Sequence, residues 1–188
     1  MEHFWKNVPG WFSDDDVNFY RHMVDTINAP AHFVEVGCWK GRSASFMAVE
    51  IIRSGKQIQF DCVDNFIGDP NEPVHQTDPN VINGTLFEEF QMNLKPVEGR
   101  YRPVRLDSVS ASKLYQDNSL DFVFIDAAHD YESVKADINS WMPKLKLNGI
   151  LAGHDYYHPP VMKAVQELIP NVEIWSTNFG SPWVTYKK

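Results

Sequence analysis

The sixteen residues FVEVGCWKGRSASFMA, Phe33 to Ala48, constrain the fold of this chain more than any other stretch. A short apolar run leads into Gly37 and Gly41, and the residues that follow can wind into a helix. Phosphate loops, dinucleotide-binding folds and other folds for nucleotide-like cofactors all use a strand, a glycine turn and a helix in this order. The rest of the sequence has to decide among these three kinds of site.

Helical and strand patterns alternate along the 188 residues. An N-capped helix is predicted from about Asp14 to Asn28, within a helical N-terminal segment of residues 1–30. Further helices are predicted at 43–53, 81–96, 108–115 and 160–168, and along the face of Val134, Ile138, Trp141 and Leu145. Strands are predicted at 33–36, 57–64, 101–106, 120–126, 147–155 (entered through an Asn-Gly turn), 171–176 and 182–187.

This alternation predicts one α/β domain that spans residues 1–188. We expect a Rossmann-like, doubly wound, mainly parallel seven-stranded sheet with helices on both faces and an antiparallel C-terminal hairpin. Residues 65–80, NFIGDPNEPVHQTDPN, are rich in Pro, Asn and Asp and are predicted to lack regular structure. A segment of this kind is either a loop over an active site or a disordered insertion.

Composition narrows the environment and the partners of the chain. The formal net charge of −8, from 25 acidic and 17 basic residues, opposes binding to a phosphate backbone, so we expect no nucleic-acid partner. No run approaches the roughly 20 apolar residues of a membrane helix, and the N-terminus lacks a basic leader. We therefore expect a cytoplasmic protein with no membrane partner. Cys38 and Cys62, in predicted buried strand ends without CxxC spacing, are predicted to be reduced thiols.

Polar residues follow five of the predicted strands at the point where each strand ends. They are Glu35 and Gly37, then Asp64, then Asp107 and Ser108, then Asp126 with His129 close behind, and finally His154 and Asp155. Acids also end strands because they favour turns, which accounts for some of these positions. In an open parallel sheet, ligands bind beyond the carboxyl ends of the strands, so we expect the polar residues to form one site.

The glycine turn fits neither of the phosphate-binding motifs. A phosphate loop has GxxxxGK[ST], whereas the spacing from Gly37 to Gly41 is one residue short and Arg42 replaces the lysine. A dinucleotide fold has GxGxxG, and here Trp39 occupies the middle glycine position. Asp64, at the end of the second strand, can accept hydrogen bonds from both hydroxyls of a ribose. S-adenosylmethionine, which has a nucleoside, no phosphate and a positive charge, fits these features.

The stretches VEVGCWKGRSA, CVDNFIGD, RLDSVSAS, FVFIDAAHDYESVKADI and LKLNGILAGHDY occur in this order between Phe33 and Asp155. In this arrangement the chain resembles the class I S-adenosylmethionine-dependent methyltransferases, and most of all the small bacterial and phage-type branch that includes sugar and antibiotic O-methyltransferases. The resemblance implies cofactor-binding roles for ten residues. Glu35, Gly37 and Gly41 would surround the methionine part with Ser43 nearby, Asp64 would hold the ribose, Asn65 and Phe66 would border the adenosine, Asp107 and Ser108 would contact the adenine, and Asp126 would lie beside the sulfonium.

Several members of this branch bind a divalent cation at positions that correspond here to Asp126, His154 and Asp155. A histidine ligand suits Mg²⁺ less well than Mn²⁺, because Mg²⁺ prefers oxygen ligands. In the alternative without a metal, His154 hydrogen-bonds a backbone group and Asp155 caps the next turn. Both alternatives remain open from the sequence.

The resemblance also implies a methyl acceptor and a group that handles the acceptor's proton. Relatives often carry an acid at the position of Ala128, so His129 becomes the candidate general base, with Asp126 beside it. In the alternative, His129 fixes its loop through an acid such as Asp130. We expect a small-molecule or sugar acceptor that enters under residues 65–80.

Four aromatic residues near the N-terminus either border the acceptor, pack inside the protein or contact a second copy of the chain. They are Phe4, Trp5, Trp11 and Phe12.

Two other functions remain open. One is a metal-dependent hydrolase that uses Asp126, His129, His154, Asp155 and His158, and the other is a non-catalytic protein that binds S-adenosylmethionine.

Overall fold

A computed structural model describes residues 1–178 and 180–188. Its described part contains a seven-stranded sheet with the order β3-β2-β1-β4-β5-β7-β6. The first five strands are parallel, and β7 is antiparallel to both β5 and β6. The strands are β1 (Ala31–Val36), β2 (Ile58–Asp64), β3 (Arg102–Arg105), β4 (Leu120–Ile125), β5 (Leu145–Gly153), β6 (Glu173–Ile174) and β7 (Trp183–Tyr186). The predicted fold class and the antiparallel C-terminal strands are confirmed.

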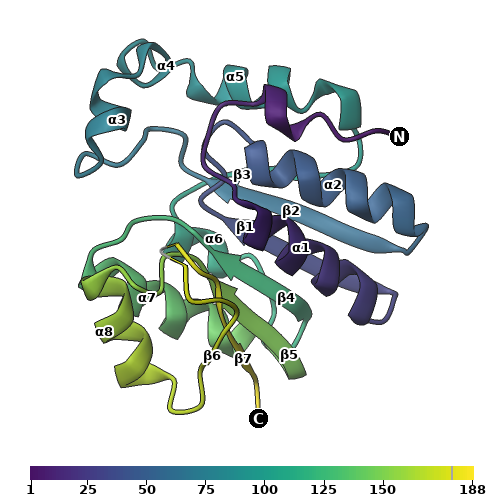
Figure 1. The fold of residues 1–188 in the computed structure, drawn as a ribbon, viewed down its shortest axis with the longest axis vertical. Helices are drawn as coiled ribbons and strands as arrows, with labels where there is room; N and C mark the ends of the chain where they lie inside the picture. The colour runs from purple at the N-terminus through teal and green to yellow at the C-terminus, as the bar shows by residue number, and fades with distance from the viewer. Residues whose placement is uncertain (179) are drawn as a thin grey trace.

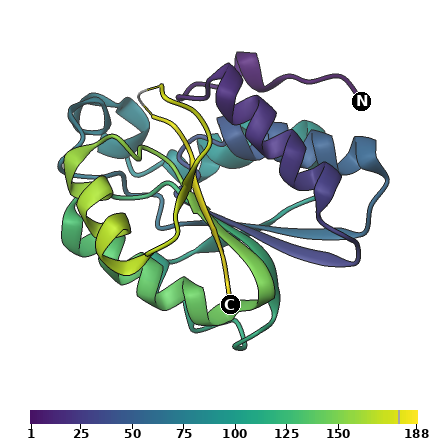
Figure 2. The same ribbon diagram turned by 60° about the horizontal axis from the view of Figure 1, so that its bottom comes forward.

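Helices cover both faces of the sheet (Figure 1). Figure 2 shows α1 and α2 on one face, and α7 and α8 on the other. The helices are α1 (Asp14–Thr26), α2 (Arg42–Ser54), α3 (Pro73–Thr77), α4 (Pro79–Ile82), α5 (Leu86–Asn93), α6 (Ser108–Ser112), α7 (Tyr131–Trp141) and α8 (Pro159–Leu168). Three short 3₁₀ turns, Trp5–Asn7, Lys95–Val97 and Met142–Lys144, complete the described elements.

Two hydrophobic cores lie on the two faces of the sheet. Successive side chains of a strand point to opposite faces, so Phe33 of β1 joins one core while Val34 joins the other. Phe122 and Val123 of β4 divide in the same way. Burial on both faces explains why Phe33 and Val34 of β1, and the residues from Phe122 to Ile125 of β4, are apolar in succession rather than alternating with polar residues.

The sheet reverses its strand order on either side of β1. β1 pairs with β2 on one side, where Val36 is opposite Val63, and with β4 on the other, where Val36 is opposite Ile125. The chain therefore leaves β2 and β4 in opposite directions across the sheet, which opens a crevice beyond the carboxyl end of β1. This crevice is where the sequence predicts the site.

The first helix begins where the sequence predicts it. Ser13 and Asp16 form a capping box, in which each side chain accepts a hydrogen bond from the backbone N–H of the other residue. The helix ends at Thr26, two residues earlier than predicted. α1 packs against α2 on the same face of the sheet.

Residues 65–80 contain regular structure, so the prediction that they lack it is wrong. Glu72 caps α3 and Asp78 caps α4, and each helix has a proline at its first turn. A proline at this position loses no helical hydrogen bond, and the preceding acid satisfies a free backbone N–H. The predicted helix at 81–96 is two helices, because Gly84 adopts a φ of 68° between α4 and α5.

The predicted Asn-Gly turn before the fifth strand is also wrong. β5 begins at Leu145, which the sequence assigns to the preceding helix face, and it continues through Asn148 and Gly149 to Gly153. Leu145 pairs with Leu120, after which the register shifts before Ile150 pairs with Phe122. Asn148 has a φ of 63° inside this irregularity. An Asn-Gly pair therefore marks a bulge within the strand here.

The two cysteines are buried free thiols, as predicted, although Cys38 lies in the turn after β1 rather than in the strand. Burial raises the pKa of both thiols. Within residues 1–178 and 180–188, no helix has the length and the apolar content that crossing a membrane requires.

Candidate active site and cofactor cavity

A cavity of about 480 Å³ opens beyond the carboxyl ends of the parallel strands. This volume falls within the range of about 300–1,000 Å³ that is usual for small-molecule sites. Its walls come from the turn after β1, the end of β2 with the segment toward α3, the β3–α6 connection, and the β4–α7 connection with α7 itself. Six of the predicted site residues line it, namely Gly37, Asp64, Asn65, Asp107, Ser108 and Asp126.

The glycines of the turn are required by packing. Gly37 has a φ of 90°, and a Cβ atom at this position would lie 1.9 Å from the backbone oxygen of Asp126. Gly41 also has a φ of 90°, and its Cβ would lie 2.2 Å from Leu94 Cδ1. The turn after β1 therefore presses directly against the end of β4, which brings Asp126 to the cavity.

Asp64 is held by two backbone amides at the cavity wall. The N–H of Trp39 donates to Oδ2 at 2.8 Å, and the N–H of Phe66 donates to Oδ1 at 2.7 Å. Burial raises the pKa of Asp64, while these backbone hydrogen bonds oppose the rise. Each carboxylate oxygen keeps a lone pair for a further donor. Phe66 itself is buried against Phe87 and Phe90 and does not line the cavity.

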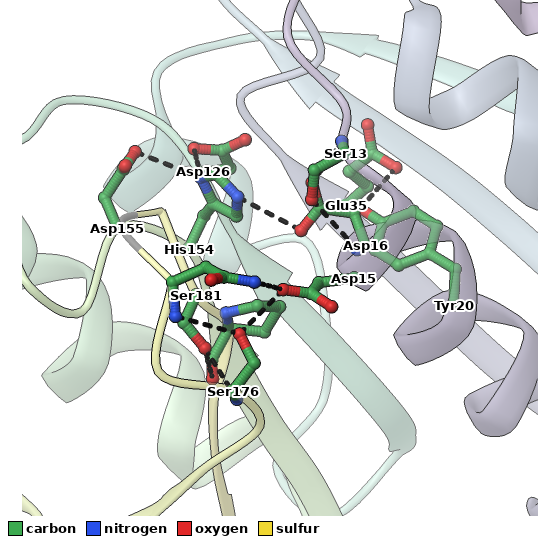
Figure 3. Close-up of polar contacts among 12 residues, drawn as sticks. Ser13, Asp15, Asp16, Tyr20, Glu35, Asp126, His154, Asp155, Ser176 and Ser181 are labelled. Carbon is green, nitrogen blue, oxygen red and sulfur yellow. Dashed lines mark hydrogen bonds and ion pairs between the residues drawn. The ribbon is translucent and has the colours of Figure 1, made fainter.

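Glu35 lies beneath the turn and does not line the cavity. Its side chain accepts hydrogen bonds from the hydroxyl of Ser43 at 2.7 Å and from the hydroxyl of Tyr20 at 3.1 Å. Burial raises the pKa of Glu35 to about 7, although these hydrogen bonds oppose the rise. Glu35 and Ser43 thus join β1 to α2 beneath the turn. Figure 3 shows Glu35 beside Tyr20 of α1.

Asp126, His154 and Asp155 come together at the ends of β4 and β5, and one potential ligand atom from each lies within 4.8 Å of the others. His154 Nδ1 is 3.1 Å from Asp155 Oδ2 and 3.8 Å from Asp126 Oδ1. On its other side, His154 Nε2 is 3.1 Å from Asp16 Oδ1 of α1 (Figure 3). His129 Nε2 lies 3.1 Å from Asp155 Oδ2 and 3.5 Å from Asp126 Oδ1.

The carboxylates keep both histidines of this cluster positively charged at neutral pH. Burial lowers the pKa of His154, but the charge of Asp126 and the hydrogen bonds to Asp155 and Asp16 raise it to about 11 overall. Hydrogen bonds to Asp126 and Asp155 raise the pKa of His129 to about 10. Burial raises the pKa of Asp155, but the two imidazoles outweigh it and lower this pKa below its usual range.

The contact of His129 with nearby acids occurs, although through Asp126 and Asp155 rather than Asp130, whereas the backbone contact considered for the His154 side chain does not. His154 hydrogen-bonds a carboxylate rather than a backbone group, and Asp155 does not cap α8, whose N-cap residue is His158. His129 contacts Asp126 and Asp155, while the carboxylate of Asp130 caps α7.

Comparison with solved structures shows the same fold in two O-methyltransferases and in a further cofactor-bound protein. The O-methyltransferase NovP aligns with a TM-score of 0.70 at 20% identity, over 93% of this chain and 80% of that chain. An O-methyltransferase from Bacillus cereus in complex with SAH aligns with a TM-score of 0.65 at 16% identity, over 97% of this chain and 86% of that chain. Cofactor-bound Rv0187 from MTB aligns with a TM-score of 0.69 at 15% identity, over 96% of this chain and 83% of that chain.

No curated protein matches the sequence. A family profile described as a methyltransferase domain matches residues 34–156, which are more than half of the chain. The chain belongs to the class I S-adenosylmethionine-dependent methyltransferases.

In this methyltransferase the predicted site residues fall into three groups. Six line the cavity, as described above. Four support its walls without lining it, namely Glu35, Gly41, Ser43 and Phe66. The remaining three, His129, His154 and Asp155, form a cluster with Asp126, so Asp126 belongs both to the cavity and to the cluster.

The donor set of the methyltransferase fits a divalent cation of intermediate softness. Asp126 and Asp155 offer carboxylate oxygens, and His154 would offer Nδ1 once a cation displaces the proton there, because its Nε2 faces Asp16. A histidine ligand whose second nitrogen faces a carboxylate is a common arrangement in metal sites. With one imidazole and two carboxylates, the set suits Mn²⁺ better than Mg²⁺.

The sequence interpretation missed three residues of the methyltransferase that border the site. Asp16 contacts His154 but has the sequence pattern of an ordinary helix cap. His75 lines the cavity and lies in a segment that the sequence treats as structureless. Asp137 also lines the cavity, and here the sequence does hold a signal, since an acid interrupts the apolar face that Val134 and Ile138 define.

Proposed function

We propose that this methyltransferase transfers a methyl group to a hydroxyl of a small molecule or sugar. One observation carries the proposal: Asp126 lies both in the cofactor cavity and in the cluster with His129, His154 and Asp155. The resemblance puts the sulfonium beside Asp126, so charged side chains would be present where the methyl group leaves. The fold likeness to NovP and to the Bacillus cereus enzyme, both O-methyltransferases, supports the same reaction class.

The protein's part in such a transfer is alignment of the reacting groups. When bound, S-adenosylmethionine supplies a methyl group on a positively charged sulfur, which is already a good leaving group. Asp64 would hold the ribose hydroxyls, and Gly37 would allow the amino-acid end to lie close to the backbone. Fixing both ends in this way sets the direction of attack and supplies most of the rate enhancement that orientation can give.

The acceptor hydroxyl must approach Asp126 from the side of the cluster. The side chain of Asp126 is 31% exposed, so an acceptor can reach it, whereas the Nε2 atom of His129 is buried. His129 already holds its proton at neutral pH, so Asp126 is the better hydrogen-bond acceptor for the incoming hydroxyl, and His129 would orient the Asp126 carboxylate. A divalent cation held by Asp126, His154 and Asp155 would lower the pKa of the same hydroxyl. The net charge of −8 favours a small acceptor over nucleic acid.

Thermal unfolding with added ligands tests cofactor use directly. We expect S-adenosylmethionine and S-adenosylhomocysteine to raise the Tm, and NAD to leave it unchanged, because a ligand that binds only the folded form stabilises it. Each ligand is added with Mg²⁺, with Mn²⁺ and with a chelator, which reports whether a cation contributes. Stabilisation by NAD and none by S-adenosylmethionine would contradict the proposal.

A second measurement tests the cluster. Transfer of a labelled methyl group is followed over a panel of sugar and phenolic hydroxyls for the wild type and for His129→Ala and Asp155→Ala. We expect both variants to bind S-adenosylhomocysteine and to lose most of their turnover. Full activity in both variants would rule out a role of the cluster in handling the acceptor's proton.

A further inference from the structure

A second cavity, of about 500 Å³, lies at the opposite end of β2 from the cofactor cavity. Its walls come from the last turn of α2, the α2–β2 connection, the start of β2 and the chain that leads into β3, and we call it the α2–β3 cavity. The two cavities share no lining residue. β2 runs from Ile58 in this cavity to Asp64 in the cofactor cavity, a span of about 20 Å at the usual rise per residue.

The floor of the α2–β3 cavity is apolar and belongs to the core between the sheet and α2. Ile51 of α2 and Phe60 of β2 line it and are 6% and 2% exposed. Ile52, Ile58 and Tyr101 also line the cavity, and they are partly buried against the same core. This floor is apolar surface that the fold leaves open to water, so an apolar ligand that covers it gains free energy.

The hydroxyl of Tyr101 is a free hydrogen-bond donor at this cavity. The Tyr101 ring packs edge-on against Phe90, with 5.6 Å between the ring centroids and 87° between the planes. Burial raises the pKa of Tyr101 to about 12, so the hydroxyl keeps its proton at neutral pH. Within residues 1–178 and 180–188, no protein group forms a hydrogen bond with this hydroxyl.

The lining of the α2–β3 cavity is positively charged, although the whole chain has a net charge of −8. Lys56, Arg100 and Arg102 line it, and none of the described residues that line it is an acid. The charge of Arg102 is matched by Asp61, whose Oδ1 accepts from Arg102 Nε at 2.9 Å. Lys56 Nζ donates only to neutral backbone carbonyls at the end of α1, and Arg100 is exposed and forms no ion pair with a described residue. Two cations therefore remain without an anionic partner here.

An apolar floor beside two unmatched cations suits a molecule that has both an apolar body and an acidic group. The guanidinium of Arg100 offers parallel N–H donors that match the oxygens of a carboxylate or sulfonate. Lys56 has already used its three protons on the carbonyls of α1, so it adds charge but no further hydrogen bond. The hydrogen bonds to the acidic group would come from Arg100 and Tyr101.

We propose that the α2–β3 cavity binds a small amphipathic anion, with its apolar body on Ile58 and Phe60 and its acidic group at Arg100 and Tyr101. This second ligand site does not rest on the proposed methyl transfer. Since the two cavities share no residue, the anion and the cofactor can bind at the same time.

Fluorescence titration of the full-length protein with two probes of the same aromatic body tests the site. Anilinonaphthalene sulfonate carries an acidic group, and N-phenylnaphthylamine lacks it. Saturating S-adenosylhomocysteine is present throughout to keep the probes out of the cofactor cavity. We expect the wild type to bind the sulfonate about tenfold to a hundredfold more tightly than the neutral probe, as a hydrogen bond to a charged group predicts. Arg100→Gln should lose most of this preference, and Tyr101→Phe should reduce it severalfold.

Arg53→Gln is the matched control, because Arg53 is an exposed cation of α2 that does not line the cavity. We expect it to keep the preference of the wild type, whereas Ile58→Gln, which makes the floor polar, should weaken the binding of both probes. Tm values show that each variant is folded. Equal affinity of the wild type for the two probes would overturn the inference, as would a preference that persists in both Arg100→Gln and Tyr101→Phe. A preference reduced as much in Arg53→Gln as in Arg100→Gln would also overturn it, since the sulfonate would then respond to positive charge in general.

Discussion

The imidazole ring of His75 lies parallel to the indole of Trp39, with 3.7 Å between the ring centroids and 17° between the planes. This stack joins α3 to the glycine turn after β1. Lys40 adds a second connection, because its Nζ lies 2.5 Å from Asp78 Oδ2 at the start of α4. Trp39 and Lys40, which are neighbours in the turn, thereby hold residues 65–80 at the rim of the cofactor cavity.

Removing the stack should loosen this segment and weaken cofactor binding. In His75→Ala we expect faster amide hydrogen exchange over residues 65–80 and a severalfold higher Kd for S-adenosylhomocysteine, because His75 also lines the cavity. Thr77→Ala is the control, since Thr77 is an exposed residue of the same helix. Equal exchange in both variants would show that the stack does not hold the segment.

The ion pair between Asp16 and His154 joins α1 to the end of β5, and its loss should destabilise the fold. Asp16 is 3% exposed, so its removal leaves the charge of His154 buried and partly unpaired. We expect Asp16→Ala to lower the free energy of unfolding by about 3–5 kcal/mol in urea denaturation. Ser13→Ala, which removes the helix cap but not the ion pair, should cost about 1 kcal/mol. A similar loss of stability in the two variants would show that Asp16 stabilises the protein through helix capping and not through its ion pair with His154.

Local sequence patterns were sufficient to predict the order of the seven strands along the chain and the edge of the sheet at which the site lies. β4 is apolar from Phe122 to Ile125 because this part is buried on both faces, and its end is marked by Asp126. Parallel strands end at one edge, so the acids after β2 and β4 had to lie near one another. These predictions needed no knowledge of contacts between distant residues.

The contacts that the sequence did not reveal are all long-range. Asp16 and His154 are 138 positions apart, and no local pattern distinguishes Asp16 from a simple helix cap. The burial of Asp137 at the cavity wall depends on how α6 and α7 pack together, which no local pattern shows. The helices within residues 65–80 were missed because proline was taken as a helix breaker, although it occurs at the first turn of each.

Adding a methyl group at Gly37 should separate β1 from β4. In Gly37→Ala the new Cβ would lie 1.9 Å from the backbone oxygen of Asp126, so one of the two strands has to move. Gly55→Ala is the control, because Gly55 also has a positive φ, of 67°, but a Cβ added there would meet nothing within 4 Å. We expect Gly37→Ala to lower the free energy of unfolding by about 1–3 kcal/mol more than Gly55→Ala does. We also expect Gly37→Ala to abolish cofactor binding. An equal loss of stability in the two variants would show that glycine is needed at position 37 only because of its positive φ.

The buried carboxyl group of Glu35 should make the protein less stable as the pH rises toward neutrality. Its pKa is about 7 in the folded state, against 4.5 as its usual value. Below pH 4.5 both the folded and the unfolded chain hold the proton, so the group has no effect on stability. Between these two values the unfolded chain releases the proton while the folded chain retains it, which lowers the free energy of unfolding by an amount on the order of 3 kcal/mol by pH 7.

Glu35→Gln removes this titration and should flatten the decline in stability from pH 4.5 to 7, as measured by urea denaturation at a series of pH values. Glu88→Gln changes a carboxylate on α5 that lies outside this buried network, and should leave the decline as it is in the wild type. A decline of the same slope in Glu35→Gln would show that Glu35 is already ionised in the folded protein. In that case the hydrogen bonds that Glu35 accepts from Ser43 and Tyr20 would fully offset the cost of burying the charged carboxylate.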